Sequence, residues 1–225
     1  MLKEKKGCQR CGGKSSEGII TMTLNEMTPQ THVSKKRMKD LFAAQFAKPS
    51  DLEEMNLSQL TPFQRALLVI DGTVTQFIEA YTFSPVEIVL LHQETQTLPT
   101  SHDWLKAEKG TEVVARQVVL QTEQKDAQQP IIHAYATSII VLNRISQNIR
   151  EGLTLKGQGL GHLLQRSGLE SRRDLLWWGL KRPTDLPEAL LHLEGKPFLS
   201  RTYRIVADGQ PIMLINEQSP LDGYA

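Results

Sequence analysis

Two charged residues stand on apolar faces of segments whose alternation is typical of β-strands. In residues 111–121 successive side chains point to opposite faces, and Arg116 shares its face with three aliphatic residues. In residues 211–217 Glu217 likewise shares a face with two apolar residues. These neighbours are Val114, Val118 and Leu120 for the arginine, and Met213 and Ile215 for the glutamate.

Three arrangements are compatible with charges in such positions. Because an unpaired buried charge is costly, Arg116 and Glu217 either pair with each other or line a polar pocket in an apolar wall. The second arrangement is the usual anatomy of a small-ligand site. The third places Arg116 at a sheet edge in solvent. The residue pattern by itself favours neither of the first two.

Several sequence motifs of well-known enzyme classes are missing from the chain. There is no Gly-x4-Gly-Lys phosphate loop, no His-Glu-x-x-His zinc motif and no Gly-x-Ser-x-Gly nucleophile elbow. The segment Gly157-Gln-Gly-Leu-Gly161 is rich in glycine, but no parallel βαβ pattern surrounds it. The sequence therefore predicts no dinucleotide or phosphate-loop site.

Residues 1–34 predict a flexible extension that precedes a single domain at 35–225. The extension is rich in Lys, Gly, Ser, Thr and Gln and has no sustained periodicity. It contains Cys8 and Cys11, which have the spacing of half a zinc knuckle. A zinc site needs four ligands, however, and the chain has no other cysteine. We expect two thiols in a solvated tail, no metal site and no cofactor; the alternative is metal sharing between molecules or redox pairing of the two thiols.

The overall composition is that of an ordinary soluble protein. The 225 residues suit one domain, and 26 Lys and Arg against 25 Asp and Glu leave a net charge of +1. This balance does not support nonspecific nucleic-acid binding, and the apolar runs are too short to span a bilayer. The charged N-terminus has no apolar stretch after it, unlike a secretory signal. We expect a cytoplasmic monomer that binds a small molecule and neither nucleic acid nor membrane.

The elements that must position Arg116 and Glu217 are predicted as one antiparallel sheet with helices packed on it. Thr61-Pro62 opens a helix, Asp71-Gly72 interrupts it, and Thr73–Tyr81 continues as a second helix. Six later segments are rich in β-branched and aromatic residues, with Asp208-Gly209 as a tight hairpin turn between the last two. These strands are predicted at Val86–Gln93, Thr111–Thr122, Ile131–Leu142, Glu170–Leu180, Phe198–Ala207 and Pro211–Glu217. Further short helices are predicted at Ser34–Ala47, Gln147–Leu153, Leu160–Gln165 and Leu186–Leu191. Strands in succession favour an α+β fold over a doubly wound one.

A set of short motifs resembles one known enzyme family. The motifs are Asp71-Gly-Thr-Val-Thr75, Arg116-Gln-Val-Val-Leu120, Ala136-Thr-Ser-Ile-Ile140, Gly159-Leu-Gly161, and Ser200–Val206 leading into Gly209–Glu217. Their order and spacing, from about Leu57 to Pro220, are similar to those of the chorismate pyruvate-lyase (4-hydroxybenzoate synthase) family, in its bacterial and plastid branch. The resemblance implies a chorismate lyase-like fold with about six strands. It also implies a cofactor-independent lyase that converts chorismate to 4-hydroxybenzoate and pyruvate. The 4-hydroxybenzoate would serve as a precursor of quinone head groups.

The resemblance further implies roles for individual residues. Arg116 would bind the ring carboxylate through its guanidinium, and the backbone N–H of Leu160 would bind the same group. Glu217 would hydrogen-bond the 4-hydroxyl and, with Arg116, form the catalytic pair. Thr73 or Val74 would close one side of the site by backbone contact.

Two positions depart from the family's pattern, and two questions stay open. Asn216 stands where Thr is frequent, and Thr137 stands where this branch often has Glu. The partner of the second substrate carboxylate is unassigned, with Arg144, Arg201 and Arg204 as candidates. The alternative function is a non-catalytic protein that binds a small acid, because effector-binding domains of bacterial transcription regulators resemble the same fold class.

Overall fold

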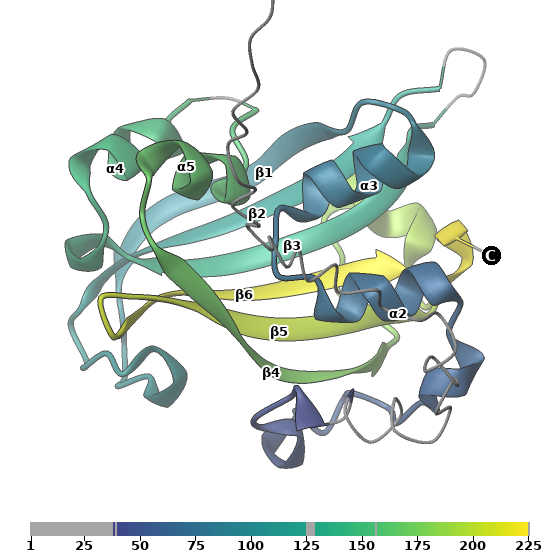
Figure 1. Ribbon diagram of the computed structural model, residues 1–225, viewed down its shortest axis with the longest axis horizontal. Helices are drawn as coiled ribbons and strands as arrows, with labels where there is room; N and C mark the ends of the chain where they lie inside the picture. The colour runs from purple at the N-terminus through teal and green to yellow at the C-terminus, as the bar shows by residue number, and fades with distance from the viewer. Residues whose placement is uncertain (1–37, 39, 125–128, 156, 225) are drawn as a thin grey trace, which may run out of the picture.

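The computed structural model describes residues 38, 40–124, 129–155 and 157–224, and its framework is one antiparallel sheet of six strands (Figure 1). The strand order across the sheet is β1-β2-β3-β6-β5-β4. The strands are β1 (Glu87–Thr97), β2 (Glu112–Thr122), β3 (Ile131–Val141), β4 (Ser171–Lys181), β5 (Phe198–Ala207) and β6 (Gln210–Pro220). The predicted α+β class and all six predicted strands are confirmed.

The α-helices for which the structure describes both ends lie over one face of this sheet, as Figure 1 shows. They are α2 (Pro62–Val69), α3 (Val74–Thr82), α4 (Gln147–Leu153) and α5 (Leu160–Ser167). Thr61 caps α2 as predicted, since its side chain accepts from the N–H of Gln64 while the Gln64 side chain accepts from the N–H of Thr61. The backbone of Ile70 is not helical, so α2 ends there and α3 begins as a separate helix at Val74.

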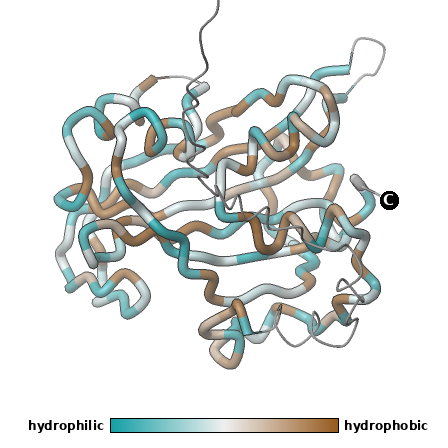
Figure 2. Tube along the Cα trace, viewed as in Figure 1, coloured by the Kyte–Doolittle hydropathy of each residue, from teal (hydrophilic) through white to brown (hydrophobic). Residues whose placement is uncertain are grey.

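The core fills the space between the helices and the sheet, where Figure 2 shows apolar stretches on both layers. Leu163 and Leu164 of α5 pack with Tyr203 and Ile205 of β5. Val74 and Ile78 of α3 and Phe63 and Leu67 of α2 pack with Leu120 and Ala134 of the central strands. This burial holds the helices on the face to which Arg116 and Glu217 also point.

Short 3-10 helices connect the strands and cover part of the opposite face. They are η2 (Gln45–Ala47), η3 (Leu57–Gln59), η4 (Asp103–Leu105), η5 (Leu142–Arg144), η6 (Glu188–Leu193) and η7 (Leu221–Tyr224). The helix predicted at Leu186–Leu191 is therefore a 3-10 helix that begins after Pro187.

The segment predicted as a helix at Ser34–Ala47 is helical at Met38 and Asp40, and Gln45–Ala47 is the 3-10 helix η2, but the prediction is wrong for residues 41–44. There the N–H groups of Ala43 and Ala44 donate to the carbonyls of Leu175 and Leu176 at 2.9 Å each. Because β4 is an edge strand, its free backbone groups compete with helix formation for this segment. Residues 1–34, with Cys8 and Cys11, lie outside the described residues.

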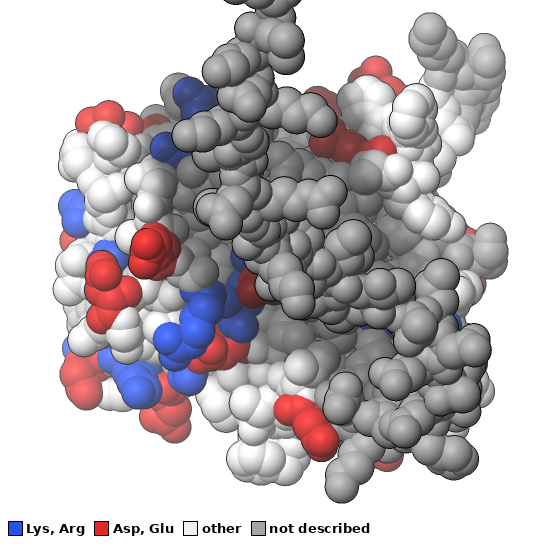
Figure 3. Space-filling model, in the orientation of Figure 1, with Lys and Arg blue, Asp and Glu red and all other residues white. Residues whose placement is uncertain are grey.

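On the face seen in Figure 3, basic and acidic side chains lie next to each other. Among the described residues, no helix is long and apolar enough to cross a membrane.

Candidate ligand site

A small cavity of about 70 Å³ lies between the helix-covered face of the sheet and the N-terminal ends of α3 and α5. Its walls are largely aliphatic, and a few polar side chains converge on it, which is the composition of small-molecule sites. The aliphatic residues are Val74, Ile88, Val118, Leu120, Leu160, Ile205 and Ile215, and the main polar ones are Arg116, Arg173, Tyr203 and Glu217.

Arg116 enters the cavity from β2 and is buried, with 3% of its surface exposed. Its guanidinium donates to Oε1 of Gln93 at 2.9 Å and to the carbonyls of Leu153 at 3.4 Å and Gln158 at 2.7 Å. All three acceptors are neutral. Burial lowers the pKa of Arg116, but an arginine stays charged at neutral pH. The cavity therefore contains a cation whose described partners do not balance its charge.

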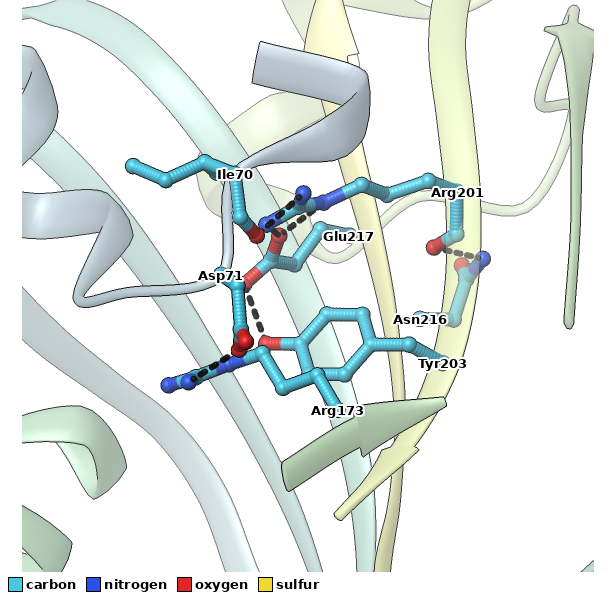
Figure 4. A network of polar contacts seen from close by, with 7 residues as sticks. All are labelled: Ile70, Asp71, Arg173, Arg201, Tyr203, Asn216 and Glu217. Carbon is cyan, nitrogen blue, oxygen red and sulfur yellow. Dashed lines mark hydrogen bonds and ion pairs between the residues drawn. The ribbon is translucent and has the colours of Figure 1, made fainter. Parts of the chain in front are cut away.

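Glu217 enters the cavity from β6 with its own counter-ion. Its Oε2 accepts from Nε of Arg201 at 2.8 Å, and its Oε1 accepts from the hydroxyl of Tyr203 at 2.9 Å (Figure 4). Nη2 of Arg201 also lies 2.8 Å from Oε2, while Nη1 donates to the carbonyl of Ile70 at 3.4 Å. Burial first, and then the charge of Glu217, raises the pKa of Tyr203, so its hydroxyl remains a donor.

Arg173 comes from β4 and lines the cavity on the side next to the surface. Its Nη1 lies 3.2 Å from Oδ1 of Asp71, a residue of the loop between α2 and α3 (Figure 4). Its guanidinium carbon lies 6.0 Å from the centre of the Tyr203 ring. Its Nε is buried and has no hydrogen-bond acceptor among the described residues.

Two helix N-termini meet at the cavity. Thr73 precedes α3 and Gly159 precedes α5, and neither helix has a side-chain cap there. The first N–H groups of a helix have no acceptor within it, and the helix dipole makes this end favourable for an anion. Gly161 permits the close approach, because a Cβ on it would lie 2.9 Å from Cγ2 of Thr73.

The residues predicted from the sequence therefore come together in one place. Arg116, Leu160, Glu217, Thr73 and Val74 all line the cavity. Of the three arrangements considered, the pocket is the observed one. Arg116 does not pair with Glu217, which is bound to Arg201, and it is not in solvent.

The sequence reasoning missed Arg173 and Tyr203. Both carry a recognisable signal, since each alternates with an apolar residue on the inner face of its strand, as Arg116 does. Among the three candidate arginines, Arg201 lies at the site but is bound to Glu217. Arg144 donates to carbonyls of η4 and β6, and Arg204 pairs with Asp174 at 3.0 Å.

The two departures from the family's pattern lie away from the cavity. Asn216 and Thr137 are cross-strand partners that line a separate hollow on the opposite face of the sheet. The Asn216 amide donates to the hydroxyls of Ser200 and Thr202 at 2.9 Å each. Neither departure replaces a cavity residue.

The fold and its cavity define a class of protein with one antiparallel sheet and helices on one face. PhnF from Mycobacterium smegmatis is similar in structure, with a TM-score of 0.53 and 15% identity over 68% of this chain and 66% of PhnF. About a third of PhnF therefore has no counterpart here. The effector domain of PhnF alone gives a TM-score of 0.51 and 17% identity, over 67% of this chain and 90% of the domain. At these identities the likeness concerns the fold alone.

The chain belongs to the Rv2949c-like chorismate pyruvate-lyase family, whose model matches residues 68–222. This confirms the family predicted from the motifs. A chorismate pyruvate-lyase from Mycobacterium tuberculosis strain CDC 1551 is 24% identical over 176 residues, which cover 74% of this chain and 83% of that protein. A chorismate pyruvate-lyase from Mycobacterium leprae strain TN is 23% identical over 154 residues, 68% of this chain and 71% of that protein.

Proposed function

We propose that this protein is a chorismate pyruvate-lyase that converts chorismate to 4-hydroxybenzoate and pyruvate. Membership of the family and the activity named for its relatives support the proposal. The observation that carries it is the buried guanidinium of Arg116, which faces the cavity with only neutral acceptors around it. A ligand carboxylate would supply the missing negative charge.

The ring carboxylate of chorismate binds at Arg116 and at the start of α5. A planar guanidinium binds a carboxylate through two parallel hydrogen bonds. The N–H of Leu160, in the uncapped first turn of α5, adds a third donor. The uncapped start of α3 at Thr73 and Val74 closes the adjacent side.

Glu217 binds the ring hydroxyl and assists the proton movements of the reaction. Each carboxylate oxygen has two acceptor positions, so Glu217 can accept one more hydrogen bond beside those from Arg201 and Tyr203. In the elimination, the ring carbon that bears the hydroxyl loses its proton, and the electron pair completes the aromatic ring. The bond from the adjacent ring carbon to the ether oxygen breaks, and enolpyruvate leaves and takes up a proton to become pyruvate.

The reaction proceeds without a cofactor, because aromatisation of the ring supplies its driving force. We further propose a cytoplasmic monomer whose product feeds quinone head groups, with neither nucleic acid nor membrane as a partner. A non-catalytic protein that binds a small acid is the second candidate, because the effector domain of PhnF has the same fold.

One experiment separates the two functions. Purified protein is incubated with chorismate alone, and 4-hydroxybenzoate and pyruvate are measured together. A lyase yields equal amounts of both, and the yield falls in the Arg116→Ala variant. Binding of 4-hydroxybenzoate by calorimetry without any pyruvate release would favour the small-acid binding protein.

A further inference from the structure

Arg173 has a hydrogen-bonding capacity that the protein itself does not use. Its Nε is buried without an acceptor among the described residues, and its side chain is 14% exposed. Leaving a charged donor buried and unsatisfied is costly, so such a group at a cavity indicates a missing acceptor. Its counter-ion, Asp71, is 68% exposed and is therefore a weak, replaceable partner.

Arg173 also lies between the cavity and a hollow on the surface. It lines the cavity together with Gly72, Thr73 and Gly161, and the same four residues line a more open hollow of about 460 Å³ beside it. Arg173 thus stands at the boundary between the two spaces. A group that extends out of the inner cavity toward this hollow meets its guanidinium.

The two arginines of the cavity stand on opposite sides of Glu217. Arg116 is on β2, Glu217 on β6 and Arg173 on β4, in the strand order β2-β3-β6-β5-β4. Arg116 and Arg173 are thus four strand spacings apart, roughly 19 Å along the sheet. All three side chains line the same cavity, so it receives a cation from a strand on each side of β6 and a carboxylate from β6 itself.

Chorismate has a matching order of groups. Its ring carboxylate is at one end, the ring hydroxyl is opposite, and the enolpyruvyl ether with the second carboxylate is on the carbon next to the hydroxyl. With the ring carboxylate at Arg116 and the hydroxyl at Glu217, the enolpyruvyl group leaves the ring beside the hydroxyl, next to Glu217 and away from Arg116. Nη2 of Arg201, like Nε of Arg173, has no hydrogen-bond acceptor among the described residues. The charge of Arg201 is balanced by the buried carboxylate of Glu217 at 2.8 Å, however, whereas the only counter-ion of Arg173 among the described residues is the exposed Asp71.

We propose that Arg173 binds the enolpyruvyl carboxylate of the substrate and exchanges Asp71 for it when chorismate enters. This inference rests on the proposed lyase function and adds a residue that distinguishes substrate from product. Chorismate has two carboxylates, and 4-hydroxybenzoate retains only the one at Arg116. Arg173 therefore contributes to substrate affinity and not to affinity for the aromatic product.

The first test compares Arg173→Gln with Arg172→Gln, a neighbour whose side chain is 65% exposed and pairs with Asp174. Losing a charge-assisted contact in Arg173→Gln raises KM for chorismate about ten- to a hundred-fold. The inhibition constant of 4-hydroxybenzoate changes less than about threefold, and Arg172→Gln leaves both constants near those of the parent. Parallel losses for substrate and product, or no change in KM, would overturn the inference.

Asp71→Asn separates ligand binding from a merely structural ion pair. If the pair only holds the loop between α2 and α3, removing either partner harms the protein in the same way. If Asp71 competes with the substrate for Arg173, Asp71→Asn lowers KM for chorismate, by about two- to fivefold for a pair this exposed. Equal increases of KM in Asp71→Asn and Arg173→Gln would assign Arg173 a structural role.

A binding measurement keeps this inference separate from catalysis. Calorimetry compares 4-hydroxybenzoate with 3-(carboxymethoxy)-4-hydroxybenzoate, which carries a second carboxylate near the position of the enolpyruvyl group. The parent protein prefers the dicarboxylate, and Arg173→Gln loses that preference while it still binds 4-hydroxybenzoate. A parent that neither binds these acids nor converts chorismate refutes the proposed function itself. A parent that converts chorismate, with an unchanged preference in Arg173→Gln, refutes only the role of Arg173.

Discussion

The carboxylate of Glu217 on β6 lies between two donors of β5, with Nε of Arg201 and the hydroxyl of Tyr203 at 2.8 and 2.9 Å. Arg201 is its direct cross-strand partner. Because each oxygen is held by a different residue, the carboxylate has a fixed direction in the cavity before any ligand arrives. Such preorganisation is what a group that acts on a bound substrate requires.

Glu217→Gln is expected to lower turnover more than affinity for 4-hydroxybenzoate. The amide retains the shape and some hydrogen bonding of Glu217 but not its charge or basicity. It also leaves Arg201 without a counter-ion, a change that costs about 3–5 kcal/mol when a pair is buried, so the thermal transition also shifts downward. Steady-state kinetics and calorimetry measure the two effects. Asn216→Ser, on the opposite face, is the control, and an equal loss of turnover and affinity would contradict the catalytic role.

Arg116→Ala is expected to weaken binding of both chorismate and 4-hydroxybenzoate. Truncating one partner of a desolvated charge pair costs about 2–5 kcal/mol, or very roughly 30-fold to several-thousand-fold in affinity. Arg116→Lys recovers only part of this, because an ammonium cannot form the two parallel hydrogen bonds. Calorimetry measures the affinity of both variants for 4-hydroxybenzoate. Each variant must first show a cooperative thermal transition, which establishes that it is folded. A folded Arg116→Ala variant with nearly normal affinity would remove Arg116 from the site.

The product should inhibit strongly, and benzoate should inhibit weakly. 4-Hydroxybenzoate makes the contacts of Arg116, Leu160 and Glu217, whereas benzoate lacks the hydroxyl that Glu217 binds. Binding that is shared by substrate and product does not accelerate the chemical step, and it slows release. Inhibition constants for the two acids provide the measurement, and similar values would argue against a hydroxyl contact at Glu217.

Gly161→Ala is expected to impair the site by separating the starts of α3 and α5. Its Cβ would lie 2.9 Å from Cγ2 and 3.0 Å from Oγ1 of Thr73, but 3.3 Å from Cβ of Thr73. The double variant Gly161→Ala/Thr73→Ala removes the two closest contacts and should regain most of the lost affinity for 4-hydroxybenzoate. Gly168→Ala, at the end of α5, is the control for a general loss of stability, because its Cβ meets no atom within 4 Å but its backbone has a φ of 66° that strains a non-glycine residue. Failure of the double variant to regain affinity would mean that the contact between these helix ends is not the cause.

The contribution of Tyr203 to the stability of the folded protein is expected to decrease at alkaline pH. Burial and the charge of Glu217 raise the pKa of Tyr203 in the folded state above its usual 10.0. Above about pH 10 the folded protein thus binds more protons than the unfolded chain, and the contribution of Tyr203 to stability decreases as pH rises. The difference in unfolding free energy between the parent and Tyr203→Phe should therefore narrow from pH 9 to pH 11. Chemical denaturation at several pH values measures it, and a constant or widening difference would contradict the burial of this hydroxyl.

Much of the architecture follows from local sequence patterns. The predicted bounds of β5 and α4 agree with the structure, because strand and helix periodicity are properties of contiguous residues. Asp208-Gly209 forms the predicted hairpin turn, with positive φ at both residues, 50° and 73°. Alternation also assigned Arg116 and Glu217 to apolar faces, and the motif resemblance assigned them to one site.

The partners of those charges depended on the tertiary structure. Continuing the register of the two-residue turn along an unbroken hairpin would pair Arg201 with Asn216. An irregularity between Ile205 and Val206 shifts the register by one residue, and Arg201 pairs with Glu217 instead. A one-residue shift changes which side chains share a face, so this bulge decides that Glu217 has a cation beside it. Arg173 comes to the same cavity only because β4 pairs with β5 at the far edge of the sheet. Such contacts join residues distant in the chain, and local patterns contain no information about their register.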